Sequence, residues 1–253
     1  MLEVKTLSKN FGGLQAIDDC FLSVQEGSIT GLIGPNGAGK TTLFNVITGF
    51  HKPDRGEVCF LNERIDGLTP NQIFHKRIFR TFQITREFEQ MTVLENLMII
   101  PAPQIGEKIW NTWFRVGSIR RQEQEIRQKA MEVLEFVELV DLRNEYAGLL
   151  SGGQKKLLEL AKSLMADPRL VLLDEPGAGV NPKLMNKLAG NIRKLCHERK
   201  ITFFLIEHDM DLVMNLCDPV IVMSEGRKLT EGHPDEIKKD SRVLGAYLGG
   251  QYR

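Results

Sequence analysis

The chain has 253 residues, 42% hydrophobic and 26% charged, as in a globular protein with a sizeable core. Its 33 basic residues balance its 33 acidic ones, so charge gives no reason to expect nucleic acid as the main partner. No stretch approaches the roughly 20 apolar residues of a membrane-spanning helix, and the N-terminus lacks the apolar core of a signal peptide. The four cysteines lie far apart in the sequence, which fits reduced thiols rather than disulfides or a zinc site.

The first sixty-five residues are predicted to form short strands separated by turns. Residues 2–7 alternate in polarity, and a second strand is expected near residue 20. The apolar run 28–34 predicts a stiff strand that ends in glycines. A helix over 42–50 and a hairpin over 53–65 follow.

A phosphate-binding loop is predicted between this stiff strand and the helix. GPNGAGKTT matches the pattern GxxxxGK[ST] in the strand–loop–helix context that the pattern requires. Glycines let backbone N–H groups point at phosphate oxygens, and the helix adds the positive end of its dipole. Lys40 is expected to reach the β- and γ-phosphates, and the Thr41 hydroxyl to bind Mg²⁺. The flanking strand and helix argue against a glycine turn with a chance lysine. The expected loop residues are Gly34, Pro35, Asn36, Gly37, Ala38, Gly39, Lys40, Thr41 and Thr42.

From about residue 85 the sequence changes to a helical pattern. Thr92 is expected to cap a helix, with Glu95 completing a capping box. Residues 119–139 predict a long amphipathic helix with one apolar stripe. An aromatic cluster of Trp110, Trp113 and Phe114 lies between these two helices, and either local packing or docking of a partner would explain it. We therefore expect a helical insertion in an α/β core.

Two apolar runs that end in polar groups predict buried parallel strands of that core. Residues 170–173 lead into Asp174 and Glu175, and residues 202–206 lead towards His208. The carboxyl ends of such strands are the usual place for ligand sites in an open α/β sheet. Asp174 is the candidate carboxylate for the metal, and Glu175 is the candidate general base for a water molecule. The imidazole of His208 is expected near the γ-phosphate or that water.

The stretch SGGQ, Ser151 to Gln154, precedes another predicted helix. Ser151 is a good N-cap, but Gly152 and Gly153 each cost about 1 kcal/mol relative to alanine inside a helix. Two glycines at a helix start could form a second anion site built from backbone amides and the helix dipole. A strained turn, or close packing against another helix, would also explain them.

Together these motifs resemble the nucleotide-binding subunit of an ATP-binding cassette (ABC) transporter, over the whole chain and in the expected order. GPNGAGKTT resembles Walker A, LVLLDE resembles Walker B with its catalytic glutamate, and LSGGQ is the family's signature motif. Phe11 resembles the aromatic residue that stacks on adenine. Gln83 resembles the glutamine of the Q-loop, with an amide oxygen for Mg²⁺ or its water, and His208 the switch histidine.

The resemblance implies an α/β fold: a P-loop NTPase (RecA-like) core with an antiparallel β subdomain and an inserted α-helical subdomain. One ABC domain is expected over 1–253, with the core and β subdomain at 1–83 and 158–253 and the helical insertion at 84–157.

The resemblance also implies the cofactors ATP and Mg²⁺ and a second cassette, identical or different. In such pairs the SGGQ helix of one cassette caps the ATP held by Walker A of the other. Ser151, Gly152, Gly153 and Gln154 would then contact the partner's nucleotide. Asn181 departs from the family, because many cassettes have aspartate at this place in the D-loop.

Further segments resemble a subgroup, the cassettes of branched-chain and other hydrophobic amino-acid importers. They include RTFQ at 80–83, EPGAGVNP at 175–182 and IEHDMDLV at 206–213. This resemblance implies two permease subunits and, indirectly, an external substrate-binding protein, with no nucleic acid. The chain would lie peripherally on the cytoplasmic face of a bacterial or archaeal membrane. The segment from Gln83 to Glu95 is the expected permease-docking region.

Four alternatives remain. Cassettes of urea importers or lipopolysaccharide exporters resemble this chain, with a different cargo. A soluble cassette ATPase acting on ribosomes or DNA would usually carry two cassettes, long coiled coils or zinc insertions, none of which is apparent. A GTPase would need an NKxD motif, and NKLA at 186–189 lacks the aspartate. A small-molecule kinase would leave the SGGQ helix unexplained.

Overall fold

The computed structural model describes residues 1–83, 86–107, 110, 113 and 115–249. The chain forms two compact units. The nucleotide-binding unit comprises residues 1–83, 169–178 and 192–253, and the helical unit comprises residues 84–168 and 179–191. The division expected from the sequence, with the helical insertion at 84–157, stays a prediction. Among the described helices, none has the length and apolar character needed to cross a bilayer.

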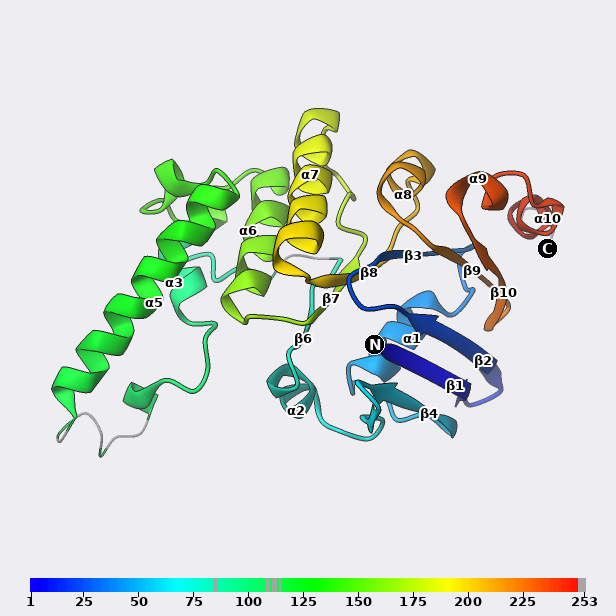
Figure 1. Ribbon diagram of the computed structural model, residues 1–253, viewed down its shortest axis with the longest axis horizontal. Helices are drawn as coiled ribbons and strands as arrows, with labels where there is room; N and C mark the ends of the chain where they lie inside the picture. Colours follow the sequence, from blue (N-terminus) through cyan, green and yellow to red (C-terminus); the bar gives the residue numbers. More distant parts are fainter. Residues whose placement is uncertain (84–85, 108–109, 111–112, 114, 250–253) are drawn as a thin grey trace. The chain divides into compact units, whose positions relative to one another are not determined.

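A six-stranded sheet organises the nucleotide-binding unit (Figure 1), and its strand order is β10-β9-β3-β8-β7-β6. Its strands are β3 (Ile29–Ile33), β6 (Ile78–Arg80), β7 (Leu170–Asp174), β8 (Thr202–Ile206), β9 (Val220–Ser224) and β10 (Arg227–Gly232). β9, β3, β8, β7 and β6 pair in parallel, and only β10 pairs antiparallel with β9. The carboxyl ends of the parallel strands therefore meet at one edge of the sheet.

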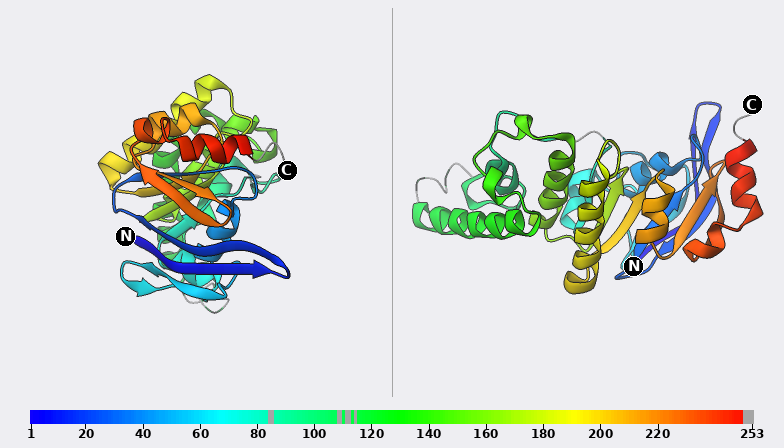
Figure 2. Two further views of the ribbon diagram at one scale, coloured as in Figure 1. Left: turned by 90° about the vertical axis from the view of Figure 1, so that its right-hand side faces the viewer. Right: turned by 90° about the horizontal axis from the view of Figure 1, so that it is seen from above.

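A four-stranded antiparallel sheet forms a second layer of this unit, with the order β2-β1-β4-β5. Its strands are β1 (Leu2–Phe11), β2 (Leu14–Val24), β4 (Arg55–Phe60) and β5 (Glu63–Arg64). Helix α1 (Lys40–Ile47) contributes Leu43, Phe44, Val46 and Ile47 to one buried core with residues of both sheets. Helices α8 (Met210–Leu216) and α9 (Pro234–Ile237) lie on the other side of the six-stranded sheet (Figures 1 and 2). These layers confirm the predicted P-loop NTPase core with an antiparallel β subdomain.

The helical unit contains α3 (Val93–Met98), α5 (Val116–Phe136) and α6 (Gly152–Met165). The capping box of Thr92 and Glu95 is present as predicted. α5 begins three residues earlier and ends three residues earlier than predicted, and Val137 follows it as the buried C-cap residue. Short 3₁₀ helices connect these elements where the unit is described: Ile105–Glu107, Val140–Leu142 and Ala147–Leu149.

Several elements were not predicted from the sequence. They are β6, α2 (Pro70–His75), α7 (Pro182–Arg199), α8, α9 and α10 (Ser241–Gly249). Most of these helices are short, and their stability comes from packing against the sheet rather than from a long amphipathic repeat. The 18-residue α7 does carry an apolar stripe at helical spacing, with Leu188, Ile192 and Leu195 buried, so its pattern was overlooked.

Candidate functional site

The loop that was predicted to bind phosphate connects β3 to α1, in the expected strand–loop–helix order. Gly34, Gly37 and Gly39 have φ angles of 150°, 80° and 96°, a region that side chains disfavour. A Cβ atom on Gly34 would lie 2.1 Å from the Met223 carbonyl oxygen, and one on Gly39 would lie 2.4 Å from that of Ala16. The backbone of β9 therefore requires glycine at position 34, and the backbone of β2 requires glycine at position 39.

Lys40 is buried at the start of α1, with its ammonium folded onto the loop. Its Nζ donates to the carbonyl oxygens of Gly34 at 2.7 Å and Pro35 at 3.0 Å. Burial lowers the pKa of Lys40, while the carboxylates of Glu175 and Asp174 act in the opposite direction. The charge of Lys40 thus lies close to the two acids at the carboxyl end of β7.

Glu175 is the centre of a polar cluster at the carboxyl edge of the sheet. Gln83 Nε2 donates to Glu175 Oε2 at 2.7 Å, and His208 Nε2 lies 3.1 Å from Glu175 Oε1. The three residues follow β6, β7 and β8, which are neighbours in the sheet. Glu175 also has a φ of 50°, an uncommon conformation for a residue with a side chain that is often found at functional sites. The structure therefore brings together three of the predicted site residues.

Asp174 forms a buried ion pair that the sequence did not reveal. Arg80 Nη2 donates to Asp174 Oδ2 at 2.9 Å, and both side chains are less than a tenth exposed. The same guanidinium donates to Asn45 Oδ1 at 2.7 Å and to Thr48 Oγ1 at 3.0 Å, both in or next to α1. The guanidinium carbon of Arg80 also lies 5.1 Å from the ring centre of Phe82. Arg80 thereby connects Asp174 at the end of β7, helix α1 and the segment that leads to Gln83. The sequence signal that could have revealed this ion pair is the RTFQ stretch at residues 80–83, which begins with Arg80.

The oxygen donors at this edge fit Mg²⁺. The hydroxyl of Thr41, the carboxylate of Asp174 and the amide oxygen of Gln83 are the hard ligands this ion prefers, while water molecules commonly complete its shell. No cluster of three or more histidine, cysteine or acidic side chains that could hold a metal occurs in the described part of the chain. Thr41, Asp174 and Gln83 therefore fit a Mg²⁺ ion whose remaining ligands would be water or substrate oxygens.

Phe11 ends β1 and is 42% exposed. Its ring meets His51 edge-on, with centroids 5.1 Å apart, and the Lys9 ammonium lies 5.4 Å from the ring centre. An exposed aromatic ring of this kind can stack on a planar base.

The signature stretch belongs to α6, and the helix begins at Gly152 rather than Gln154. Ser151 Oγ accepts from Gln154 N–H, and Gln154 Oε1 accepts from Ser151 N–H at 2.8 Å, a full capping box. Gln154 therefore has a structural role within the chain. Neither glycine has a positive φ, so backbone conformation explains neither of them.

The two glycines differ in what surrounds them. A Cβ atom on Gly153 would lie 2.2 Å from Leu184 Cδ2 in the first turn of α7, so packing against another helix accounts for this glycine. A Cβ atom on Gly152 would meet nothing within 4 Å, and the residue is exposed. Contacts within the described chain thus give no reason for Gly152 to be glycine.

Asn181, the departure in the D-loop, caps α7. Its Oδ1 accepts from the N–H of Leu184 at 3.0 Å. Asparagine and aspartate are both strong N-caps, so the local fold is satisfied by either residue.

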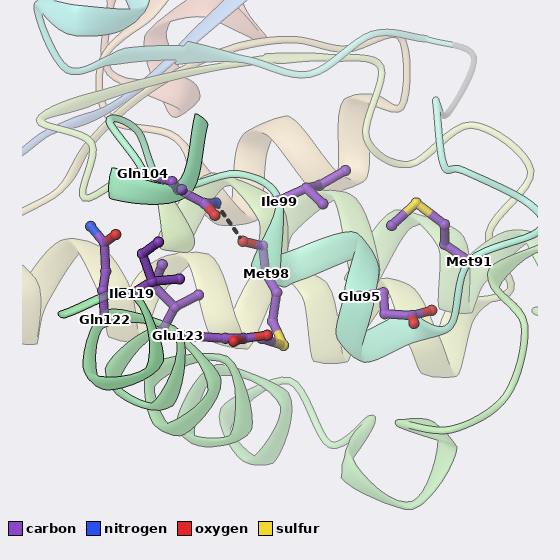
Figure 3. A pocket seen from close by; sticks show the side chains of 10 residues that line it. Met91, Glu95, Met98, Ile99, Gln104, Ile119, Gln122 and Glu123 are labelled. Atoms are coloured by element: carbon purple, nitrogen blue, oxygen red, sulfur yellow. Dashed lines mark hydrogen bonds between the residues drawn. The ribbon is translucent and has the colours of Figure 1, made fainter. Parts of the chain in front are cut away.

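A pocket of about 310 Å³ lies between α3, α5 and the 3₁₀ segment that starts at Ile105. Methionine and isoleucine side chains from both helices line it, and two carboxylates accompany them (Figure 3). Its lining residues are Met91, Glu95, Met98, Ile99, Gln104, Gly106, Ile119, Gln122, Glu123 and Ile126. The pocket includes part of the predicted docking segment, Met91 and Glu95. Among the described residues that line the pocket, none is lysine or arginine.

Of the aromatic cluster, Trp110 and Trp113 are 79% and 81% exposed. Local core packing therefore does not account for these two side chains. Phe114 lies outside the described residues.

Residues 17–178 match the family model described as ABC transporter. The chain belongs to the ABC transporter family. It is an ATPase of this family and binds nucleotide. It is 42% identical to the high-affinity branched-chain amino acid transport ATP-binding protein BraF of Pseudomonas aeruginosa, over 98% of both chains.

Solved cassette structures have the same fold. A crystal structure of the ADP conformation of an ABC transporter cassette covers 98% of both chains, with 39% identity and a TM-score of 0.85. A dimeric cassette in a post-hydrolysis state, bound to ADP and Pi, is 26% identical with a TM-score of 0.76. It covers 92% of this chain and 99% of its own.

Proposed function

We propose that this ABC ATPase energises an importer of branched-chain or other hydrophobic, neutral amino acids. The name of the relative BraF supports this cargo, together with 42% identity over nearly the full length. The chain would work at the cytoplasmic face of a bacterial or archaeal membrane, bound to two permease subunits, and would never touch the amino acid. An external binding protein would deliver the cargo.

The cluster around Glu175 is the observation that best supports hydrolysis. Glu175 would accept a proton from the attacking water, and His208 and Gln83 hold its carboxylate on both oxygens. Lys40 would leave the loop carbonyls to bind the β- and γ-phosphates. Thr41, Asp174 and Gln83 would hold Mg²⁺, which neutralises charge on the phosphates when bound. Phe11 would stack on the adenine.

A second cassette is proposed to complete the site. Ser151 and the amides of Gly152 and Gly153 would cap the γ-phosphate held by the other cassette, because a helix N-terminus binds anions. The exposed Gly152, with nothing near its missing side chain, supports this role. The relative solved as a dimer supports the pairing.

The variant Glu175→Gln tests the proposed base. We expect it to bind ATP with near-normal affinity and to lose at least about 100-fold in turnover, since proton transfer to a positioned base contributes this much. It should also trap an ATP-bound dimer in size-exclusion chromatography. Wild-type turnover in this variant would contradict the assignment.

The pocket between α3 and α5 is proposed as the permease-docking site. Its methionine and isoleucine lining with two carboxylates suits a cytoplasmic permease segment that carries apolar side chains and one basic side chain. We expect Glu123→Lys to release the chain from the membrane fraction. Glu125→Lys makes the same charge change at an exposed position of α5 where Glu125 pairs with Arg121, and it should stay bound. Equal binding of both variants would place docking elsewhere.

The cargo is tested by uptake of labelled leucine, proline and urea in cells that lack the gene. Loss of leucine or proline uptake with normal urea uptake is the expected result. Loss of urea uptake alone would assign the cassette to a urea importer, and no change in any of them would favour an exporter or a non-transport role.

A further inference from the structure

Glu207 is a buried carboxylate for which the proposed mechanism has no use. It directly follows β8 and is 3% exposed. Burial raises the pKa of Glu207, against the effect of nearby backbone N–H groups. A buried ionisable side chain is costly unless its partners hold it in place, so its contacts indicate what it does.

The contacts of Glu207 join two separate loops. Its Oε1 accepts from the N–H of Gly177, in the loop after β7, at 2.6 Å. Its Oε2 accepts from the N–H of His208 at 3.0 Å and, more weakly, from that of Asp209 at 3.5 Å. Gly177 is two residues past Glu175, and the side chain of His208 contacts Glu175 Oε1. His208 Nε2 lies 3.1 Å from Glu175 Oε1, so the two loops are joined twice: by this contact and by the carboxylate of Glu207.

We propose that Glu207 is a positioning residue that fastens the loop after β7 to the loop after β8 and thereby holds His208 against Glu175. This inference rests on the proposed roles of Glu175 and His208 in hydrolysis. Only a carboxylate offers one acceptor oxygen to each loop. A glutamine has the same shape, but its NH₂ group would face one of the two backbone N–H donors and lose that hydrogen bond.

The test compares Glu207→Gln with Thr202→Val, which lies at the opposite end of the same strand. Thr202 is fully buried, and its Oγ1 accepts from the N–H of Gly27 at 2.9 Å. The valine variant removes this one hydrogen bond away from the loops, so it controls for a general loss of stability. Glu207→Asp keeps both acceptor oxygens on a shorter stem and should recover part of the activity.

We expect Glu207→Gln to lower kcat for ATP about tenfold or more while KM stays within about twofold, because small misplacements of catalytic groups mainly affect the chemical step. Thr202→Val should lower the melting temperature without lowering kcat. A kcat of Glu207→Gln within about twofold of the wild type would overturn the inference. So would an equal loss of kcat in Thr202→Val.

Amide hydrogen exchange in the full-length protein gives a readout that does not depend on turnover. The amides of Gly177 and His208 should exchange at least about tenfold faster in Glu207→Gln and unchanged in Thr202→Val. Unchanged exchange in Glu207→Gln would overturn the inference. A wild-type protein that binds ATP without hydrolysing it would instead count against the proposed function, and the exchange rates would still decide whether Glu207 fastens the loops.

Discussion

Helices α1 and α6 both begin beside glycines, but the two sets of glycines are there for different physical reasons. At α1, Gly34 and Gly39 have positive φ angles and have backbone carbonyl oxygens where a Cβ would stand. At α6 the backbone is ordinary helix, and a capping box closes its start. A Cβ atom on Gly153 would overlap the side chain of Leu184, whereas a Cβ atom on Gly152 would have no neighbour within 4 Å. The first loop needs glycine in order to fold, whereas no contact in the described part of the chain requires glycine at position 152, where we propose that the partner's nucleotide binds.

The largest effect is expected for Gly34→Ala. Its methyl group would overlap the Met223 carbonyl at a strained φ, so we expect a loss of about 3 kcal/mol or more in unfolding free energy, with loss of ATP binding. Chemical denaturation measures the unfolding free energy, and nucleotide titration measures ATP binding. The control Gly37→Ala shares a positive φ in the same loop but has open space, and it should lose only about 1 to 2 kcal/mol. Equal stability of the two variants would contradict the steric argument.

Gly152→Ala should separate stability from activity. Alanine favours the helix, so the unfolding free energy should stay the same or rise by about 0.5 kcal/mol. Hydrolysis should fall at least about tenfold, since the methyl would obstruct close approach of a phosphate to the α6 amides. Normal hydrolysis in this variant would remove the main support for a trans contact at Gly152.

Gly153→Ala should destabilise the protein by about 1 to 2 kcal/mol through contact with Leu184, less than at Gly34 because a leucine side chain can shift. Adding Leu184→Ala should make the alanine at 153 nearly neutral. A double-mutant cycle by denaturation measures this coupling. Additive effects would mean that Leu184 is not the reason for this glycine.

The smallest effect is expected for Asn181→Asp. Aspartate can accept the same bond from Leu184 N–H, so the unfolding free energy should change by less than about 0.5 kcal/mol. Asn181→Ala, which removes the cap, should lose about 1 kcal/mol. Thermal unfolding of the three proteins distinguishes these cases. If Asn181→Asp lowers the unfolding free energy as much as Asn181→Ala does, then capping of α7 is not the role of Asn181.

Local patterns allowed much of the fold to be predicted. The apolar runs before Gly34, Asp174 and His208 became neighbouring parallel strands, and the Thr92 and Ser151 capping boxes are present. The capping box of Ser151 was expected only in part, since Gln154 was read as a ligand-contacting residue alone. Short helices such as α2 and α9 were missed because four to six residues carry too little periodicity.

By itself, the sequence determined the glycine-rich loop before α1, the acids at the end of β7 and the family resemblance, because these depend on residue types at fixed spacings along one segment. Only the tertiary structure decided that Arg80 pairs with Asp174, that Glu207 bridges Gly177 and His208, and that Gly153 faces Leu184. These contacts join residues up to 94 positions apart. The pairing of strands and helices sets such distances, and local sequence spacing carries no record of them.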